Sequence, residues 1–273
     1  MSNKSTITAI IIAKNEEEMI VNCVETVRWC DEVLVIDNNS TDKTVQLAEA
    51  SGARVVSTKA SSFSELRNEG LKKAKTDWVF YLDADERVTP KLAQEIQVHV
   101  ETNDAAVLQV KRKNIYYGQL VTHGGWGRDL LERVFLRSAL KTWQGQVHES
   151  PEFTGQVIKL HQELVHFTHR NTRDNLLKSA DWTLVEAKLL YEAKSPQVKI
   201  STLFRKAIME FVRRLIFKKG YQDGIVGWIE SMVQGMNKFL VYLQLWELQQ
   251  KPSLSDQYQQ AEREIVELWK QQS

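Results

Sequence analysis

Short apolar runs alternate with amphipathic segments over the first third of the chain. Four runs rich in isoleucine, valine and aromatic residues predict β-strands at residues 6–13, 32–36, 54–57 and 78–82. The intervening residues 16–29, 42–51 and 64–74 place apolar side chains at helical spacing. Strands alternating with helices of about 10 to 15 residues predict an α/β fold, with a Rossmann-like, mostly parallel sheet and helices on both faces.

The pattern changes from about residue 105. Further strands are predicted at residues 106–110, 131–136 and 157–165, separated by glycine-rich segments such as residues 123–127. From residue 174 onward nearly every segment has helical periodicity. We therefore expect an α/β domain over residues 1–172 and a helical C-terminal region over residues 173–273.

The charge balance excludes some functions. The chain has 36 basic and 35 acidic residues, a formal net charge of +1. A nucleic-acid-binding surface needs a strong positive excess, so nucleic acid is not an expected partner. The only cysteines, Cys23 and Cys30, form neither a CxxC pair nor a disulfide framework, which fits a reducing compartment.

Targeting and membrane-spanning segments are not expected from the sequence. The first apolar run is short and leads directly into Lys14-Asn15-Glu16, unlike a signal peptide. The longest candidate span, residues 225–246, carries Glu230 and Lys238, and each charge at mid-bilayer costs a few kcal/mol. We expect a cytoplasmic protein.

Acidic residues follow two of the predicted strands. Asp37 comes directly after the second strand, and Asp83 and Asp85 come after the fourth. The carboxyl ends of parallel strands form the ligand crevice of an open α/β sheet. Oxygen ligands suit Mg²⁺ or Mn²⁺, and Mg²⁺ is usually held by one or two carboxylates together with substrate phosphates. The alternative for each motif is an ordinary solvated acidic turn.

Five segments together resemble a known family. They are IIIAKNEE (residues 10–17), DEVLVIDNNSTDKT (31–44), LRNEGLKKAKTDWVFYLDADE (66–86), HGGWGRDLLERVFLR (123–137) and VHE (147–149). In order and spacing these segments resemble glycosyltransferase family 2, which has the GT-A fold. The last two are similar to the lipopolysaccharide inner-core β-1,4-glucosyltransferase-like branch. The resemblance is best over residues 5–170.

The resemblance implies a donor site and a metal site. The implied donor-binding residues are Asn15, Glu16, Asp37, Arg67, Asn68, Asp83, Trp126 and His148. Asp83 and Asp85 would be the DxD pair, with Asp85 closest to an Mg²⁺ or Mn²⁺ ion and Asp83 on the ribose or the metal. A late histidine, His166 or His169, would complete the metal shell. Local structural roles remain open for all of these, such as a helix N-cap at Asn15 and Glu16 or an exposed helix cation at Arg67.

An inverting transferase also needs a general base for the acceptor hydroxyl. The family pattern implies a carboxylate well downstream of the DxD pair, and Glu149 is the best candidate. The chain lacks the commoner Glu-Asp spelling of this site. Asp129 is the rival candidate, and Glu149 could also be an ordinary loop acid.

The C-terminal region contains a basic amphipathic segment. Residues 199–219 carry seven basic side chains and one acidic one, with phenylalanine, leucine and isoleucine interleaved. A basic helix of this kind is typical of a membrane-surface element. A second apolar helix is expected over residues 224–249. Both helices could instead simply cover the α/β domain or join two copies in an oligomer.

The resemblance implies an inverting, metal-dependent transferase that moves one hexose, most simply glucose from UDP-glucose, to a saccharide acceptor. The acceptor would be the lipopolysaccharide inner core, reached by a peripheral enzyme on the cytoplasmic face of the inner membrane. Three alternatives stay open: a polyprenyl phosphate or protein acceptor, a nucleotidyltransferase, and a non-catalytic module that binds nucleotide sugars or membranes.

Overall fold

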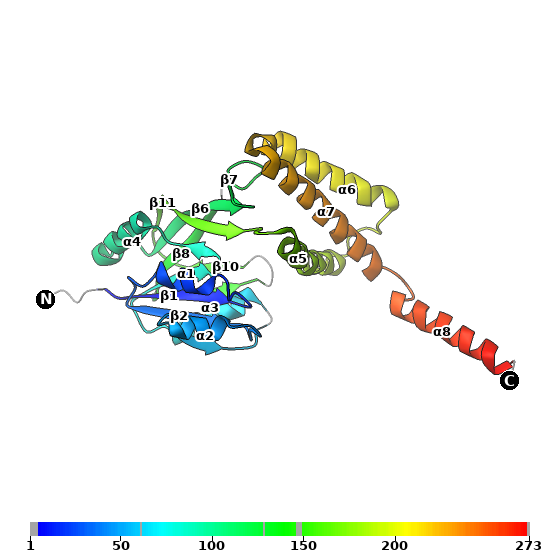
Figure 1. The fold of residues 1–273 in the computed structure, drawn as a ribbon, viewed down its shortest axis with the longest axis horizontal. Coiled ribbons are helices and arrows are strands. Elements are labelled where there is room, and N and C mark those ends of the chain that lie inside the picture. Colours follow the sequence, from blue (N-terminus) through cyan, green and yellow to red (C-terminus); the bar gives the residue numbers. More distant parts are fainter. Residues whose placement is uncertain (1–4, 61, 128, 146–148, 272–273) are drawn as a thin grey trace. The chain divides into compact units, whose positions relative to one another are not determined.

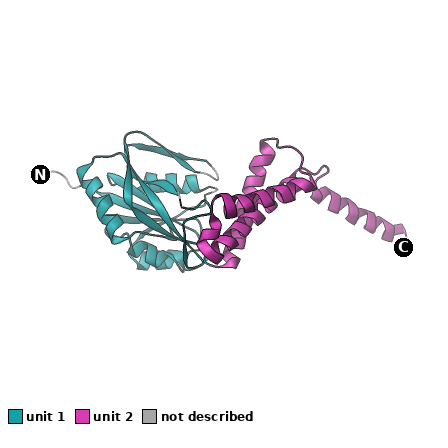
Figure 2. Cartoon of the chain, turned by 90° about the horizontal axis from the view of Figure 1, so that it is seen from above, with its two compact units in different colours: residues 1–170 teal, residues 171–273 magenta. Residues whose placement is uncertain are grey.

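The computed structural model describes residues 5–60, 62–127, 129–145 and 149–271 (Figure 1). The chain divides into two compact units, Met1–Arg170 and Asn171–Ser273 (Figure 2). The division falls two residues before the boundary drawn from the sequence.

Unit 1 is an α/β domain. Its elements are β1 (Ile7–Ala13), α1 (Ile20–Glu25), β2 (Glu32–Asp37), α2 (Thr44–Ala50), β3 (Arg54–Ser57), α3 (Phe63–Lys73), β4 (Trp78–Asp83), β5 (Glu86–Arg87), α4 (Pro90–Thr102), β6 (Val107–Tyr116), β7 (Gln119–Val121), β8 (Leu130–Leu136), β9 (Leu140–Gln144), β10 (Ser150–Phe153) and β11 (Val157–Thr168).

The main sheet has the strand order β3-β2-β1-β4-β8-β6-β11-β5, with β7 paired to β6. The four strands β3, β2, β1 and β4 are all parallel. Beyond them β8 runs antiparallel between β4 and β6, and β11 returns parallel to β6. The predicted α/β fold with a helical C-terminal region is confirmed. The sheet is parallel in its first half and mixed in its second.

β1 and most of β2 and β4 are buried on both faces, which explains why their sequences contain continuous apolar runs, whereas the edge strand β3 is partly exposed. In β1, Ile10 and Ile12 pack with α3 and the β9 side chains on one face. Ile11 and Ala13 pack with α1 and α4 on the other. A Cβ added at Gly70 would come within 2.5 Å of the Ile10 side chain, so α3 depends on this glycine to approach the sheet closely.

Two expectations for unit 1 need correction. The helix expected over residues 16–29 is an α-helix only over Ile20–Glu25, with turns before and after it. At its end the Thr26 hydroxyl donates to the Cys23 carbonyl, a local bond that competes with continued helix. Helix α4 was not assigned from the sequence at all. It begins at Pro90 with the Thr89 side chain accepting from Leu92 N, which is a recognisable N-terminal pattern.

Unit 2 is helical. Its elements are α5 (Thr172–Glu192), α6 (Ile200–Val212), the π-helix η1 (Arg213–Phe217), the 3₁₀-helix η2 (Gly220–Asp223), α7 (Gly224–Leu248) and α8 (Leu254–Gln271). Ala187, Val198, Val241 and Leu245 form its buried apolar cluster. The basic segment 199–219 is therefore not one regular helix, since it passes from α6 into η1 and reaches a left-handed Lys219 with φ of 58°. Within the described residues, no helix combines the length and apolarity needed to cross a membrane.

Candidate functional site

The carboxyl ends of β1 and β2 bring the first predicted donor residues together. Asn15, with φ of 54°, accepts from Thr41 N at 2.8 Å through its side-chain oxygen, and its own N–H donates to the Ser40 hydroxyl at 2.8 Å. Asp37 is 1% exposed and accepts from Ser40 N at 3.2 Å. Glu16 N donates to the Thr44 hydroxyl at 2.8 Å. These contacts hold the loops after β1 and β2 together.

Asp83, at the carboxyl end of β4, is held by two guanidinium groups. Arg67 Nη2 lies 2.9 Å from Asp83 Oδ1, and Arg133 Nη2 lies 2.8 Å from Oδ2. Burial alone would raise the pKa of Asp83, but the charges of Arg133, Arg67 and Arg112 hold that pKa well below its usual range. Both carboxylate oxygens of Asp83 are therefore engaged in ion pairs.

Sequence reasoning missed the charged side chains beneath this turn. Glu86 is fully buried, accepts from Asp83 N at 2.9 Å, and pairs with Arg133 at 2.6 Å and Arg112 at 3.4 Å. Burial lowers the pKa of Arg133, yet the Asp83 and Glu86 carboxylates raise it above its usual value. The sequence does contain a signal for this pairing. Arg133 stands among Leu, Val and Phe in the apolar strand β8, and a charge buried there is stable only when it is paired.

Asp85, just before β5, lies beside His166 on the neighbouring strand β11. The antiparallel pairing of β11 with β5 sets His166 opposite Glu86, next to the DxD turn. His166 Nε2 lies 3.5 Å from Asp85 Oδ2. Two ligands about 2.1 Å from one cation at a right angle are about 3.0 Å apart, so a small movement lets both bind the same ion.

No group of three or more His, Cys, Asp or Glu side chains suited to a metal occurs among the residues that the structure describes. A cation at Asp85 and His166 would need its remaining ligands from water or from substrate phosphates, as Mg²⁺ commonly does. His169, the alternative histidine, packs its ring against Tyr116, with centroids 4.6 Å apart. Of the two histidines, His166 is therefore the one that lies beside Asp85.

Arg67 connects the DxD turn with Glu149. Its side chain is 3% exposed, and Nη2 lies 3.1 Å from Glu149 Oε1. The guanidinium carbon lies 4.9 Å from the centre of the Trp143 ring. Its Nη1 atom is buried without a hydrogen-bond partner among the described residues, although buried donors are normally satisfied.

The remaining predicted residues have other surroundings. Asp129 is paired with Arg112, its Oδ2 lying 2.6 Å from Nη2. The Asn68 side chain contacts the backbone of Trp143 at both ends, at 2.8 Å and 2.9 Å, and so anchors β9. Trp126 is half-buried, with its ring centroid 5.3 Å from that of Tyr116. His148 lies outside the described residues.

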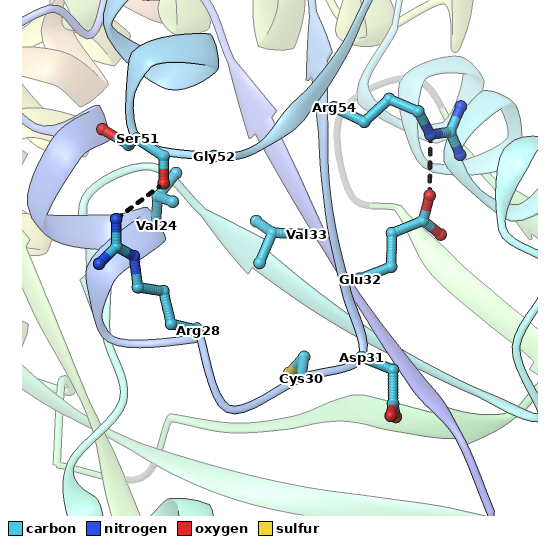
Figure 3. A pocket seen from close by; sticks show the side chains of 9 residues that line it. All are labelled: Val24, Arg28, Cys30, Asp31, Glu32, Val33, Ser51, Gly52 and Arg54. Carbon is cyan, nitrogen blue, oxygen red and sulfur yellow. Dashed lines mark hydrogen bonds and ion pairs between the residues drawn. The ribbon is translucent and has the colours of Figure 1, made fainter.

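A separate pocket of about 330 Å³ lies near the start of β2 and β3, where ligands of open α/β sheets do not normally bind (Figure 3). Its charged side chains are already engaged. Arg54 Nε lies 2.8 Å from Glu32 Oε1, and Arg28 Nη2 donates to the Ser51 carbonyl at 3.2 Å. The pocket does not contain any predicted site residue.

The half-sheet of parallel strands thus ends in an acidic turn after β4, and this turn lies beside a histidine from β11. Residues 8–169 match the family model described as Glycosyl transferase family 2, and the chain belongs to that family.

Several relatives align with nearly the whole chain. An uncharacterized glycosyltransferase of Rickettsia bellii (strain RML369-C) is 26% identical over 265 residues, covering 89% of this chain and 86% of the relative. The lipopolysaccharide core biosynthesis glycosyltransferase LpsC of Rhizobium meliloti (strain 1021) is 25% identical over 272 residues, covering 94% and 98%. Among solved structures, S. aureus TarS 1-349 in complex with UDP-GlcNAc is 13% identical with a TM-score of 0.48, covering 91% and 92%.

Proposed function

We propose that this glycosyltransferase is inverting and metal-dependent, and that it moves one glucose from UDP-glucose to a saccharide of the lipopolysaccharide inner core. The observation that carries the proposal is the Asp85–His166 pair, 3.5 Å apart, beside the buried Arg67–Glu149 ion pair. The similarity to LpsC, named as a lipopolysaccharide core enzyme, supports the acceptor class.

Asp85 and His166 would hold an Mg²⁺ or Mn²⁺ ion, with Asp83 as a further candidate ligand. The bound ion would neutralise charge on the departing nucleoside diphosphate. Arg67 would contribute positive charge beside the diphosphate, since guanidinium groups suit phosphate geometry. The positive charges of Arg67 and Arg133 would offset the charge of Asp83, which would otherwise repel a diphosphate.

The nucleotide would bind against the loops after β1 and β2. Asn15, Glu16 and Asp37 would contact the base and the ribose, Asp37 through the carboxylate at the end of β2. Asp83 would be available to the ribose only after exchanging one of its ion pairs. Asn68 would act on this site indirectly, because its side chain anchors Trp143, on which Arg67 stacks.

Glu149 would be the general base. Its carboxylate would take the proton from the acceptor hydroxyl while that oxygen forms a bond to C1 of glucose. The bond between C1 and the diphosphate oxygen breaks on the opposite face, which inverts the configuration. Arg67 would position Glu149 for this step. Trp126 would stack on a sugar face, and His148 would approach the phosphates. Asp129 is the competing candidate for the base.

Thermal unfolding with UDP, GDP, ADP or CMP, each with and without Mn²⁺, tests the donor and metal assignments together. A ligand at about 100 times its Kd stabilises the native state by about 2.7 kcal/mol. We expect stabilisation by UDP that requires Mn²⁺, followed by glucose transfer from UDP-glucose to core saccharide. Stabilisation by a different nucleotide alone would overturn the assignment of UDP-glucose as the donor. Transfer only to a polyprenyl phosphate or a protein would overturn the assignment of a core saccharide as the acceptor.

We further propose that unit 2 binds the anionic surface of the inner membrane from the cytoplasmic side, as a peripheral contact. The turn from α6 to α7 exposes Phe217, which is 78% exposed, and Ile225, which is 67% exposed. Lys218 and Lys219 add positive charge at this turn, next to Arg213 and Arg214, which both pair with Glu210. Exposed apolar side chains among cations suit an anionic lipid surface.

The first half of α7 supports this proposal because its large apolar residues face outward. Gly227, Ser231 and Gly235 are buried, whereas Trp228 and Met232 are 47% and 62% exposed. Small residues let α7 approach α6 closely, as at Gly235, where an added Cβ would lie 3.1 Å from the Ala207 carbonyl oxygen. An exposed apolar face of this kind marks an interaction surface. A second copy of the chain is a less suitable occupant, since two basic faces would repel each other.

A further inference from the structure

The side-chain amide of Asn114 joins two parts of the candidate site. Asn114 lies on β6 and is 1% exposed. Its Nδ2 donates to the Trp126 carbonyl at 3.2 Å, and its Oδ1 lies 2.7 Å from His166 Nδ1. In the parallel pairing of β6 with β11, Asn114 and His166 are direct neighbours. The amide therefore links the glycine-rich loop at residues 123–127 to the histidine that faces Asp85.

Hydrogen-bond chemistry fixes the direction of both contacts. A backbone carbonyl can only accept, so the nitrogen end of the Asn114 amide must point to Trp126. The oxygen end then points to His166, and this oxygen can only accept. His166 must therefore carry a hydrogen on Nδ1. In the neutral ring this leaves Nε2 without a hydrogen, with its lone pair available on the side of Asp85.

We propose that Asn114 is a positioning residue that holds His166 in the Nδ1–H tautomer, so that Nε2 can bind a divalent cation together with Asp85. The inference rests on the metal site of the proposed function. A histidine that binds a metal commonly donates its other ring hydrogen to a fixed acceptor, and losing this acceptor typically costs about 10- to 100-fold in metal affinity. Asn114 supplies that acceptor from a buried strand.

The tautomer can be read without any metal or nucleotide. Nitrogen-15 NMR of the histidine side chains distinguishes Nδ1–H from Nε2–H, and the spectrum of His166→Ala identifies the His166 signals. We expect the Nδ1–H form in the unsubstituted protein and a mixture of tautomers in Asn114→Ala. An Nε2–H form in the unsubstituted protein, or an unchanged tautomer in Asn114→Ala, would overturn the inference.

A double-mutant cycle on Mn²⁺ affinity tests whether Asn114 acts through His166. With UDP present, free Mn²⁺ measured by electron paramagnetic resonance should show an affinity loss of about 10- to 100-fold for Asn114→Ala. In a His166→Ala background the same substitution should cost nothing further, because coupled residues are not additive. Independent, multiplying losses would contradict the inference.

Two further measurements keep the inference separate from the proposed function. If Asn114→Ala does not fold, Asn114→Asp retains an acceptor for His166 Nδ1 and should retain Mn²⁺ affinity. A folded Asn114→Asp protein that loses as much affinity as His166→Ala would overturn the inference. Failure of the unsubstituted protein to bind Mn²⁺ would overturn the metal site of the proposed function, and the tautomer measurement would still decide the role of Asn114.

Discussion

Arg67 and Glu149 form an ion pair between residues 82 positions apart, with Nη2 lying 3.1 Å from Oε1. The same Nη2 atom lies 2.9 Å from Asp83. The carboxylate proposed as the base is thus fixed by the guanidinium group that also neutralises the DxD turn. Because a general base acts only within hydrogen-bond reach of the proton that it removes, this pairing bears directly on catalysis.

We expect Glu149→Gln to lower kcat by about 10²- to 10⁴-fold, because the amide cannot take the acceptor proton. Stabilisation by UDP with Mn²⁺ should change little, since the donor does not need the base. Asp129→Asn is the matched control, as it also removes one carboxylate charge from an arginine pair. Initial rates of glucose transfer decide the point. A larger kcat loss in Asp129→Asn than in Glu149→Gln would assign the base to Asp129.

Asp85→Ala should nearly abolish transfer while leaving the protein folded. The side chain proposed to hold the cation is lost, but Asp83, Glu86 and Arg133 retain their own ion pairs. Mn²⁺-dependent stabilisation by UDP should disappear as well. Asp104→Ala, which removes a carboxylate from the surface pair with His99, provides the control. Near-normal turnover in a folded Asp85→Ala protein would refute the metal assignment.

The sequence predicted the parallel half of the sheet well because β1, β2 and β4 contain continuous apolar runs between helices, and the short strand β3 fills the gap between two predicted helices. Strands β5, β7, β9 and β10 escaped prediction, since two to five residues carry no readable period. Among the candidate residues, Asp85 and His166 were predicted separately. Their meeting depends on the register of β11 with β5, which sequence spacing cannot reveal.

The buried charges were the least predictable part of the site. Arg133 and Glu86 occupy positions where the hydrophobic pattern alone leads one to expect apolar side chains. Their charges are compensated by pairing with each other and with Asp83 and Arg112, and the Arg133–Glu86 pair joins β8 to the residue after Asp85. Likewise, Asn68 resembles a donor ligand in sequence, but its side chain contacts the Trp143 backbone.

The Asp83 ion pairs predict a specific sensitivity to acid. The pKa of Asp83 is lower in the folded protein than its usual value of about 3.9, so the ion pairs contribute stability above that pH. This contribution is lost as the pH falls from about 4 towards the folded-state pKa. Urea unfolding between pH 7 and pH 3 should therefore show a steeper loss in the unsubstituted protein than in Asp83→Asn. Equal pH dependence in the two proteins would contradict the pairing.

Arg133→Met tests the same network at neutral pH. Removing one partner of a buried ion pair leaves uncompensated charge and typically costs about 3–5 kcal/mol. Arg133 is 4% exposed in its side chain, so solvent cannot replace it at Asp83 and Glu86. Urea unfolding at pH 7 measures the free-energy loss. Arg137→Met is the control, because that arginine is exposed and donates to a backbone carbonyl. A similar small effect of both substitutions would show that the network is not stabilising.

The turn from α6 to α7 predicts binding to anionic vesicles. Near an anionic surface each lysine contributes about 1 kcal/mol, so Lys218→Gln with Lys219→Gln should weaken binding by about 30-fold. Phe217→Ser should weaken it by a comparable amount, because a buried phenylalanine contributes about 1.5–3 kcal/mol. Co-sedimentation with phosphatidylglycerol vesicles measures both effects. Raising the salt concentration should weaken binding of the unsubstituted protein and should affect the double lysine variant less.

Helix α8 provides the matched control for this surface. Tyr258 and Trp269 are 78% and 69% exposed, so they are as accessible as Phe217. Their helix carries more acidic than basic residues and would be repelled by anionic lipid. Tyr258→Ser with Trp269→Ser should therefore leave vesicle binding unchanged. If these α8 substitutions abolish binding while Phe217→Ser does not, the membrane contact lies on α8 and not on the α6–α7 turn. If neither set changes binding, apolar insertion at both places is excluded.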